Sequence, residues 1–364
     1  MKRRDFIFGG AAASLCAGPA IGLETSAGRL VINQVVAGLN TPWAFQFLPD
    51  GSIVITERDG ALRIWTTAGL ADVSGVGDVV ARGQGGLLDV LVPRDFARTR
   101  HLFFTYSKRQ NLGSGTAVAR ARLSSDGSRL ETWEDIFEIR RGSSGGRHFG
   151  SRLVEAQDGT LFVTIGDRGD RRSAQDRANE NGTVLRITKT GAVPADNPFT
   201  KTSGVQPAIW SWGHRNAQGA ALDTEGNLWV IEHGAKGGDE LNRVRKGANY
   251  GWPVISYGRH YTGLKIGEGT EKEGLEQPVY YWDPSIAPSG LLFYSGSMFP
   301  DWAGSAFSGS LKMDYIARLS GGPFREVEQI RIPGASRFRD IRQGPDGSIW
   351  VLSVGDGALY RLSS

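Results

Sequence analysis

The sequence predicts an all-β protein, specifically a six-bladed β-propeller with four-stranded antiparallel blades. Three observations support this prediction. The 364 residues include 51 glycines and 10 tryptophans among runs of β-branched and aromatic residues, which is typical of strands joined by many turns. One hairpin pattern recurs along the chain at long intervals. A short strand at 357–362 can pair with a strand near Leu30 and close a ring.

The first element is a leader for export, residues 1–27. The basic group Lys2-Arg3-Arg4 precedes an apolar stretch, 7–21, and small residues follow it. This order is typical of a twin-arginine signal peptide, which exports proteins that fold before they cross the membrane. We therefore expect a periplasmic protein, cleaved near Ala27, in which residues 28–364 form one domain; the alternative is a basic tail without a targeting role. Cleavage removes Cys16, the only cysteine, so no disulfide or cysteine nucleophile is expected.

Four hairpins then carry the repeat, each consisting of an apolar strand, an acidic residue followed by glycine, and a second apolar strand. The acidic-Gly turn supplies the positive φ that tight hairpins need. The hairpins span 43–55, 153–164, 221–231 and 341–352, and a weaker copy lies at Asp126-Gly127. Their turn glycines, at positions 51, 159, 226 and 347, are 108, 67 and 121 residues apart. These intervals are close to multiples of about 55 to 60 residues, so six blades fit better than seven.

Composition excludes several classes of protein. The formal net charge is only +4, and Lys and Arg are scattered among 38 acidic residues, which does not indicate a nucleic-acid-binding protein. No stretch after the leader approaches the roughly 18 uninterrupted apolar residues of a membrane helix. The glycines at 83–86 lack the spacing of a nucleotide-binding loop, and the five histidines lack the spacing of a zinc site.

A candidate base lies in the glycine-rich segment 145–169. His148 precedes a turn and an apolar strand, 161–165, and Asp167 follows that strand. If the strand returns the chain to the same rim, His148 and Asp167 meet as a base and the carboxylate that orients it. The alternative is a loop histidine without a chemical role.

Three further segments carry polar groups on predicted loops. Arg215 and Asn216 offer a forked donor and an amide, which suit an anionic or carbonyl-bearing ligand. Arg337 and Arg339 project to one side of an extended segment and require an anion between them, either a ligand or the nearby Asp340. The segment 232–242 combines glycines with three acidic residues, as Ca²⁺ sites do, although it lacks EF-hand spacing and is equally typical of a solvated acidic turn.

Taken together, these motifs resemble the soluble quinoprotein glucose/sorbosone dehydrogenase family, most closely its bacterial aldose sugar dehydrogenases. The resemblance extends from about Leu39 to Leu362. Five segments carry it: 147–152, 165–169, 213–216, 238–242 and 337–340. It implies a six-bladed propeller that holds pyrroloquinoline quinone (PQQ) and Ca²⁺ and oxidises aldose sugars to aldonolactones, passing electrons to an acceptor that the sequence does not identify.

The resemblance also implies roles for individual residues. His148 is similar to the catalytic base, Asp167 to its orienting carboxylate, and Arg215 to the cation beside the quinone. The residues similar to cofactor contacts are Gln84, His148, Arg215, Asn216, Tyr257, Tyr261, Lys312, Arg337 and Arg339. The carbonyls of Gly234 and Ala235 would hold a Ca²⁺ at the quinone, and Glu240 with the carbonyl of Tyr250 a structural Ca²⁺.

Two departures from the family pattern and two rival functions accompany the resemblance. Many relatives have Pro where this chain has Ala235. The dimerisation and substrate loops of the glucose-specific enzymes are long, whereas this chain is shorter, which implies a monomer with a wide pocket. A Ca²⁺-dependent propeller lactonase would have no use for the cations Lys312, Arg337 and Arg339. A non-catalytic binding propeller would not require the pair of His148 and Asp167.

Overall fold

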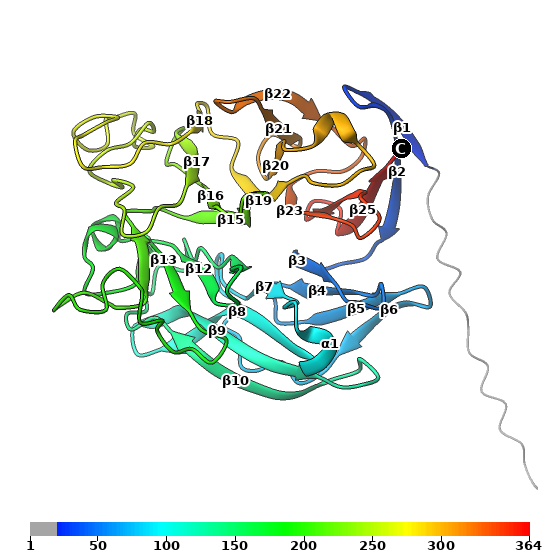
Figure 1. The fold of residues 1–364 in the computed structure, drawn as a ribbon, viewed down its shortest axis with the longest axis horizontal. Helices are drawn as coiled ribbons and strands as arrows, with labels where there is room; N and C mark the ends of the chain where they lie inside the picture. The colour runs from blue at the N-terminus through cyan, green and yellow to red at the C-terminus, as the bar shows by residue number, and fades with distance from the viewer. Residues whose placement is uncertain (1–19) are drawn as a thin grey trace, which may run out of the picture.

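Six β-sheets are arranged in a ring around a central axis (Figure 1) in the computed structural model, which describes residues 20–364. Blade one consists of β3 (Pro42–Phe47), β4 (Ile53–Glu57), β5 (Leu62–Thr66) and β6 (Gly69–Val73). Blade two consists of β7 (Leu87–Leu91), β8 (His101–Gln110), β9 (Gly113–Leu123) and β10 (Leu130–Glu138). Blade three consists of β11 (Leu153–Glu155), β12 (Leu161–Ile165), β13 (Thr183–Ile187) and β14 (Ile209–Trp212). The next two consist of β15 (Ala217–Leu222), β16 (Leu228–Glu232), β17 (Asp239–Arg243) and β18 (Tyr280–Trp282); and β19 (Pro288–Phe293), β20 (Ala306–Ser310), β21 (Ile316–Ser320) and β22 (Arg325–Ile330). The predicted six-bladed propeller is confirmed.

The sixth blade joins the two ends of the described chain. It contains β23 (Phe338–Gln343), β24 (Ile349–Ser353) and β25 (Ala358–Ser363), followed by β2 (Gly28–Val36) and β1 (Ile21–Thr25). β2 pairs with β25 in antiparallel register, with Ile32 opposite Leu362, so the predicted closure is confirmed. This blade has five strands, one more than predicted, because β1 pairs along the outer edge of β2.

The four predicted hairpins are the inner hairpins of blades one, three, four and six. Their turn glycines all have positive φ, from 83° to 84°. The weaker copy at Asp126-Gly127 instead connects the outer strands β9 and β10. Blades two and five lack the signal because their inner strands are joined through short helices, α1 (Phe96–Thr99) and η2 (Pro300–Trp302), instead of tight turns. The only other helical segment of residues 20–364 is η1 (Arg171–Gln175).

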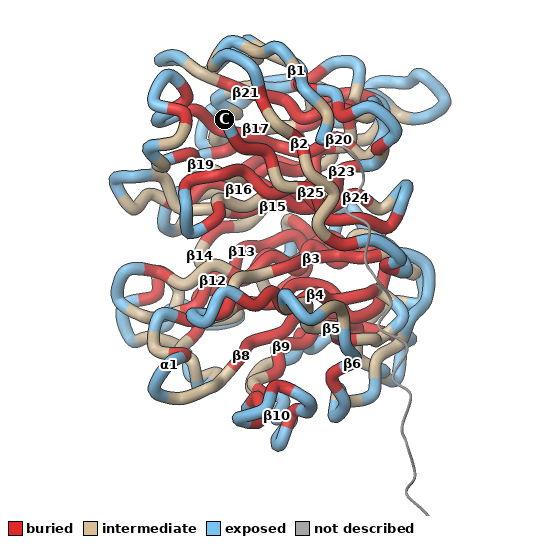
Figure 2. The backbone as a smooth tube through the Cα atoms, turned by 90° about the vertical axis from the view of Figure 1, so that its right-hand side faces the viewer, coloured by how far each residue is buried: buried red, intermediate tan, exposed pale blue. Residues whose placement is uncertain are grey.

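The hydrophobic core is divided into six main clusters, each between two neighbouring blades. Figure 2 shows buried residues concentrated on the strands and exposed residues concentrated on the connecting loops. The innermost strands contact one another all the way around the axis. This arrangement leaves the loops between blades free to carry polar side chains. Among the described residues, no helix is long and apolar enough to cross a membrane.

Ser26 fastens β1 to the fifth blade. Its backbone nitrogen and hydroxyl donate to the carboxylate of Glu328 at 2.8 and 2.5 Å. The same hydroxyl accepts hydrogen bonds from Trp302 Nε1 at 2.9 Å and Arg318 Nη2 at 3.1 Å. These contacts lower the pKa of Glu328, although its partial burial acts in the opposite direction. Residues 20–27 of the predicted leader are therefore part of the folded propeller, whereas residues 1–19 lie outside the described residues.

Candidate active site

His148 and Asp167 meet across the third blade. His148 Nδ1 lies 2.6 Å from Asp167 Oδ1. Asp167 follows β12 directly, so this strand returns the chain to the loop that carries His148, as predicted. The carboxylate can only accept when ionised, so Nδ1 carries the proton and Nε2 keeps its lone pair. The two residues thus form a hydrogen-bonded pair in which the carboxylate orients the imidazole.

The His148 loop is held in a left-handed conformation. His148 itself has φ +52°, a region that few residues other than glycine adopt. Its backbone nitrogen donates to Gln84 Oε1 at 2.7 Å, and the nitrogen of Gly150 donates to Asn216 Oδ1 at 3.1 Å. The chain comes so close to Gly166 that a Cβ there would lie 2.1 Å from the His148 carbonyl oxygen. Gln84 and Asn216 therefore fix the backbone of this loop.

Trp252 is a partner of Asp167 that sequence reasoning missed. Its indole Nε1 donates to Asp167 Oδ2 at 2.9 Å, while the backbone nitrogen of Gly169 donates to Oδ1 at 2.7 Å. Trp252 is far from Asp167 in sequence and lies on a loop without regular secondary structure, so no local pattern indicated the contact. Both carboxylate oxygens are thus occupied, which fixes the orientation of Asp167.

Burial, hydrogen bonds and nearby charges shift the pKa values of His148 and Asp167, and these influences partly oppose one another. Burial lowers the pKa of His148, and the nearby Arg215 guanidinium lowers it further, against the opposing hydrogen bond to Asp167. Burial would raise the pKa of Asp167, but the hydrogen bond from His148, the backbone of Gly169 and the charge of Arg215 outweigh it, so this pKa is lowered. The result is a neutral imidazole beside an ionised carboxylate near neutral pH.

Arg215 is held by the residues around it. Its Nη1 donates to the carbonyl of His233 at 3.1 Å, and the guanidinium lies 5.4 Å from the Trp252 ring centroid. Its backbone nitrogen donates to Glu232 Oε2 at 2.7 Å, and the other oxygen of Glu232 lies 2.8 Å from His214 Nδ1. His214 and Glu232 are buried, and their contacts hold the segment that carries Arg215 in place.

These groups open into one cavity of about 430 Å³, which we call the base cavity. Its lining residues come from the loops of blades two to four: Gln84, Arg147, His148, Asp167, Gly169, Arg171, Arg215, Ala235, Trp252, His260, Tyr261 and Ile266. This volume is within the usual range for small-molecule sites.

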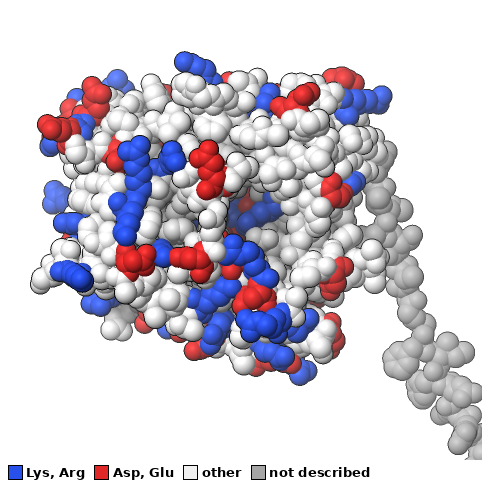
Figure 3. All heavy atoms as spheres, viewed as in Figure 1, with Lys and Arg blue, Asp and Glu red and all other residues white. Residues whose placement is uncertain are grey.

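A second cleft, the arginine cleft, has about 150 Å³ and shares Gln84 with the base cavity. Its lining residues include Trp43, Arg58, Asn216, Gln218, Arg337 and Arg339. Figure 3 shows basic side chains in the hollow at the centre of the ring. Since the cleft has no carboxylate among its lining residues within 20–364, an anionic ligand fits it.

Arg339 occupies the inner wall of the arginine cleft. It is 8% exposed, its Nη2 donates to Gln218 Oε1 at 2.8 Å, and its guanidinium lies 4.3 Å from the Trp43 ring centroid. Burial, with the charge of Arg152, lowers its pKa to about 9. Its Nε is buried without a hydrogen-bond partner in the part of the chain that the structure describes. An anion would supply both the missing charge and a missing acceptor.

Asp340 does not lie between the two arginines. Its carboxylate pairs with Arg152 at 3.0 Å and with Arg342 at 3.1 Å. Arg337 is exposed and donates from Nη1 to the carbonyl of Leu311 at 3.1 Å. Asp340 is therefore not placed between the side chains of the two arginines.

Three of the predicted contacts lie at or beyond the margin of these cavities. Tyr261 lines the base cavity but is 76% exposed. Lys312 is exposed and lines neither cavity, although the adjacent Leu311 lines the arginine cleft. Tyr257 stacks on Tyr281 with ring centroids 4.1 Å apart and faces an outer groove between blades four and five.

Three of the four predicted metal-binding residues surround a small cavity of about 10 Å³ behind the base cavity: Gly234, Glu240 and Tyr250. Burial and the neighbouring Glu232 raise the pKa of Glu240 to about 8. A cation stabilises the neighbouring carboxyl groups of the buried Glu232 and the half-buried Glu240 when both are ionised, and this volume suits a single small ion or water. Ala235, the fourth, lines the base cavity instead.

Side chains alone do not provide a metal site. Among residues 20–364, no cluster of three or more His, Cys, Asp and Glu side chains is placed to bind a metal ion. Backbone carbonyls must therefore complete any Ca²⁺ site. Carbonyl oxygens are close to the turn at Gly234, because a Cβ at Gly234 would lie 2.2 and 2.3 Å from the carbonyl oxygens of Gly237 and Gly238.

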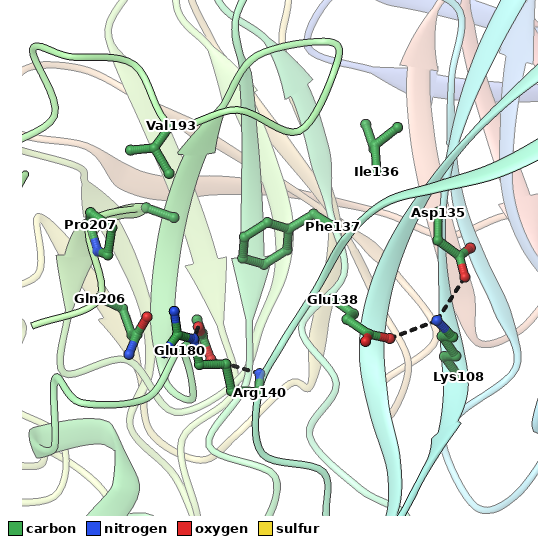
Figure 4. A pocket seen from close by; sticks show the side chains of 11 residues that line it. Lys108, Asp135, Ile136, Phe137, Glu138, Arg140, Glu180, Val193, Gln206 and Pro207 are labelled. Atoms are coloured by element: carbon green, nitrogen blue, oxygen red, sulfur yellow. Dashed lines mark hydrogen bonds and ion pairs between the residues drawn. The ribbon is translucent and has the colours of Figure 1, made fainter.

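A further cavity of about 430 Å³ lies at the outer edge of blades two and three (Figure 4). Its charged groups pair with one another: Lys108 Nζ lies 2.8 Å from Asp135 and 2.7 Å from Glu138, and Arg140 Nε lies 3.7 Å from Glu180. Because each of these charged groups has an ionic partner within the lining, the cavity shows no comparable demand for a ligand.

Comparisons with known proteins agree with this geometry. The glucose/sorbosone dehydrogenase family model matches residues 39–361. The chain is 44% identical over 335 residues to the aldose sugar dehydrogenase YliI of Escherichia coli, covering 89% of this chain and 90% of that protein. It is 26% identical over 414 residues to the quinoprotein glucose dehydrogenase B of Acinetobacter calcoaceticus, covering 90% and 86%.

Two solved structures are similar over nearly the whole chain. The apo-form of the soluble aldose sugar dehydrogenase from Escherichia coli superposes with a TM-score of 0.88 at 42% identity, covering 92% of this chain and 99% of that one. The PQQ-bound form of the aldose sugar dehydrogenase from Streptomyces coelicolor has a TM-score of 0.76 at 24% identity, covering 94% and 99%, and shows the shared fold.

Proposed function

The chain belongs to the glucose/sorbosone dehydrogenase family, and from that premise we propose that it oxidises aldose sugars at the anomeric carbon to aldonolactones, with PQQ and Ca²⁺ as cofactors. The observation that carries this proposal is the pair of His148 and Asp167, in a cavity that adjoins a cleft lined by unpaired arginines. The names of a quinoprotein relative and of a PQQ-bound structural neighbour support the choice of cofactor.

The residues present fit both cofactors. Arg337 and Arg339 would hold the carboxylates of PQQ, and Arg215 with Asn216 would lie beside its carbonyl groups. The carbonyls of Gly234 and Ala235 would hold a Ca²⁺ at the quinone, and Glu240 with the carbonyl of Tyr250 a second, structural ion. When bound, PQQ supplies the two-electron acceptor.

The protein groups supply the proton transfer and the orientation. The anomeric hydroxyl must lose its proton as the C1 hydrogen leaves, and His148 Nε2 is available to accept it. Asp167 fixes the tautomer and stabilises the imidazolium that forms, and Trp252 fixes Asp167. Arg215 adds a fixed positive charge that favours negative charge developing in the cavity.

One experiment separates this function from its two rivals. Protein incubated with PQQ and Ca²⁺ is expected to acquire quinone absorbance and to reduce an artificial dye when glucose is added. Chelation of Ca²⁺ is expected to abolish dye reduction. A lactonase would instead hydrolyse lactones without dye reduction, and a binding propeller would do neither. Absence of PQQ binding in the presence of Ca²⁺ would contradict the proposal.

The pH profile tests the roles of His148 and Trp252. Only neutral His148 can accept a proton, so kcat/KM should fall as pH drops through a pKa below the usual 6.5. Trp252→Phe removes the donor to Asp167 Oδ2, which makes the carboxylate more basic and raises the pKa of His148. The acid limb should therefore move to higher pH, while Trp65→Phe, outside both cavities, should not move it. An unchanged acid limb in Trp252→Phe would exclude the positioning role.

We further propose that the protein is exported to the periplasm by the twin-arginine route and cleaved before Ile21. Cleavage at Ala27 would remove β1 and Ser26, leaving Glu328, Trp302 and Arg318 without a shared partner. N-terminal sequencing of the exported protein should therefore find Ile21–Thr25 retained, and replacement of Arg3 and Arg4 by Lys should keep the precursor in the cytoplasm. An N-terminus at Gly28 would contradict the cleavage position, and normal export of the Lys variant would contradict the route.

A further inference from the structure

The base cavity carries an excess of positive charge. Its lining includes three guanidinium groups, those of Arg147, Arg171 and Arg215. Asp167 is its only lining carboxylate among residues 20–364. Arg215 is buried and bound to the carbonyl of His233, and Asp167 is bound to His148, so these two groups are committed within the protein. The charges of Arg147 and Arg171 remain.

Neither of these two arginines is neutralised by the protein. Both are exposed, and within the described part of the chain neither forms an ion pair. Arg171 Nη1 lies 3.2 Å from His260 Nε2. A guanidinium only donates, so His260 Nε2 is the acceptor in this contact. The contact orients Arg171 without cancelling its charge.

Both arginines are placed by the same backbone that places the base. Arg147 immediately precedes His148, and its side chain crosses the loop after Asp167, because a Cβ at Gly169 would lie 2.6 Å from Arg147 Nε. Arg171 begins η1, four residues after Asp167. The cations of the arginine cleft form a separate set, since the two cavities share only Gln84 among their lining residues. Since the carboxylates of PQQ are assigned to Arg337 and Arg339 in the arginine cleft, the charge of Arg147 and Arg171 is available to a substrate.

Resting on the proposed function, we propose that the preferred substrate is an anionic aldose, with a carboxylate at C6 or a phosphate on O6 that contacts Arg147 and Arg171. Guanidinium groups bind both anions through paired hydrogen bonds, and their field draws an anionic substrate toward the cavity. The chemistry at C1 is unchanged. The C1–H and hydroxyl O–H bonds break and the lactone C=O bond forms; His148 takes the proton, and the acceptor takes the hydrogen with two electrons.

The test compares three sugars on the full enzyme loaded with PQQ and Ca²⁺. At low ionic strength, kcat/KM is expected to be about tenfold higher for D-glucuronate or for D-glucose 6-phosphate than for D-glucose, in line with one charge-assisted contact. Which of the two exceeds glucose identifies the anion. Added NaCl should reduce this ratio and leave the rate with glucose nearly unchanged.

Single and double variants test whether Arg147 and Arg171 cause the preference for anionic sugars. Arg147→Gln and Arg171→Gln should each reduce the ratio of anionic to neutral sugar, and the double variant should bring it near one. Arg172→Gln is the matched control, because Arg172 is exposed, adjacent to Arg171 and outside the cavity lining. It removes the same charge and should leave the ratio unchanged.

A binding measurement provides a readout that does not depend on turnover. Calorimetric titration of the protein without PQQ should detect tighter binding of the preferred anionic sugar than of D-glucose, and Arg171→Gln should remove the difference. Equal kcat/KM for all three sugars, or a preference that survives in the double variant, would overturn the inference. If no sugar is oxidised although PQQ binds, the proposed function fails, and the calorimetric comparison still decides whether an anionic sugar is recognised.

Discussion

Replacing His148 with alanine is expected to lower kcat by about 10²- to 10⁴-fold, the usual contribution of a general base. His148 lines the base cavity, and a carboxylate lies 2.6 Å from its Nδ1, which leaves Nε2 on the other side of the ring free to accept a proton. PQQ should remain bound, because the arginine cleft is formed by other side chains. Steady-state dye reduction and quinone absorbance measure the two quantities separately.

Two further variants test whether the loss of activity is specific to the base at position 148. Asp167→Asn should remove only part of the activity, since Nε2 is still present but its tautomer is no longer fixed. His101→Ala makes the same substitution on a partly buried histidine of β8 outside both cavities, and should keep the wild-type rate. If His148→Ala retained half of the wild-type rate, another group would have to be the base.

Reversing the charge of Arg339 is expected to give the second large effect, a loss of PQQ affinity of about 3 to 5 kcal/mol. Arg339→Glu places a buried carboxylate where the structure holds a buried cation between Trp43 and Gln218. An anionic cofactor would then face a desolvated anion. Equilibrium titration with PQQ in the presence of Ca²⁺ measures the loss.

The exposed Arg337 provides an internal comparison for this prediction. Arg337→Glu should weaken PQQ binding by less, because solvent screens its charge. Arg129→Glu, with a side chain that is 61% exposed on the second blade, should have no effect on the titration. Since Arg339 is buried, thermal unfolding must show that its variant folds. A folded Arg339→Glu protein with unchanged PQQ affinity would remove the arginine cleft from the cofactor site.

The sequence predicted those parts of the fold that depend on local conformation. Acidic-Gly turns require positive φ, so the inner hairpins of four blades were visible in the chain. The inner hairpins of blades two and five were not visible, because α1 and η2 replace the tight turn and have no fixed residue pattern.

The candidate site likewise has a part that could be predicted from local sequence and a part that could not. His148 and Asp167 could be predicted because a single strand, β12, connects them. The bond from Trp252 to Asp167 could not, since it joins a loop of blade four to blade three and depends on packing between blades. Arg147 was present in a recognised motif, but its unpaired charge became evident only when its surroundings were known.

The closure of the ring by β2 and β25 determines when folding can finish. The other blades are each formed by one continuous segment of the chain, whereas in the sixth blade antiparallel hydrogen bonds join strands from the two ends of the described chain, with Val31 opposite Ser363. Gly22 and Ser363 both lie opposite Val31, on either side of β2, so these two residues are about 10 Å apart. Contacts of such long sequence separation form late. The growing polypeptide must hold β2 unpaired along its inner edge until β25 leaves the ribosome, so synthesis to nearly the last residue is a precondition for a closed propeller.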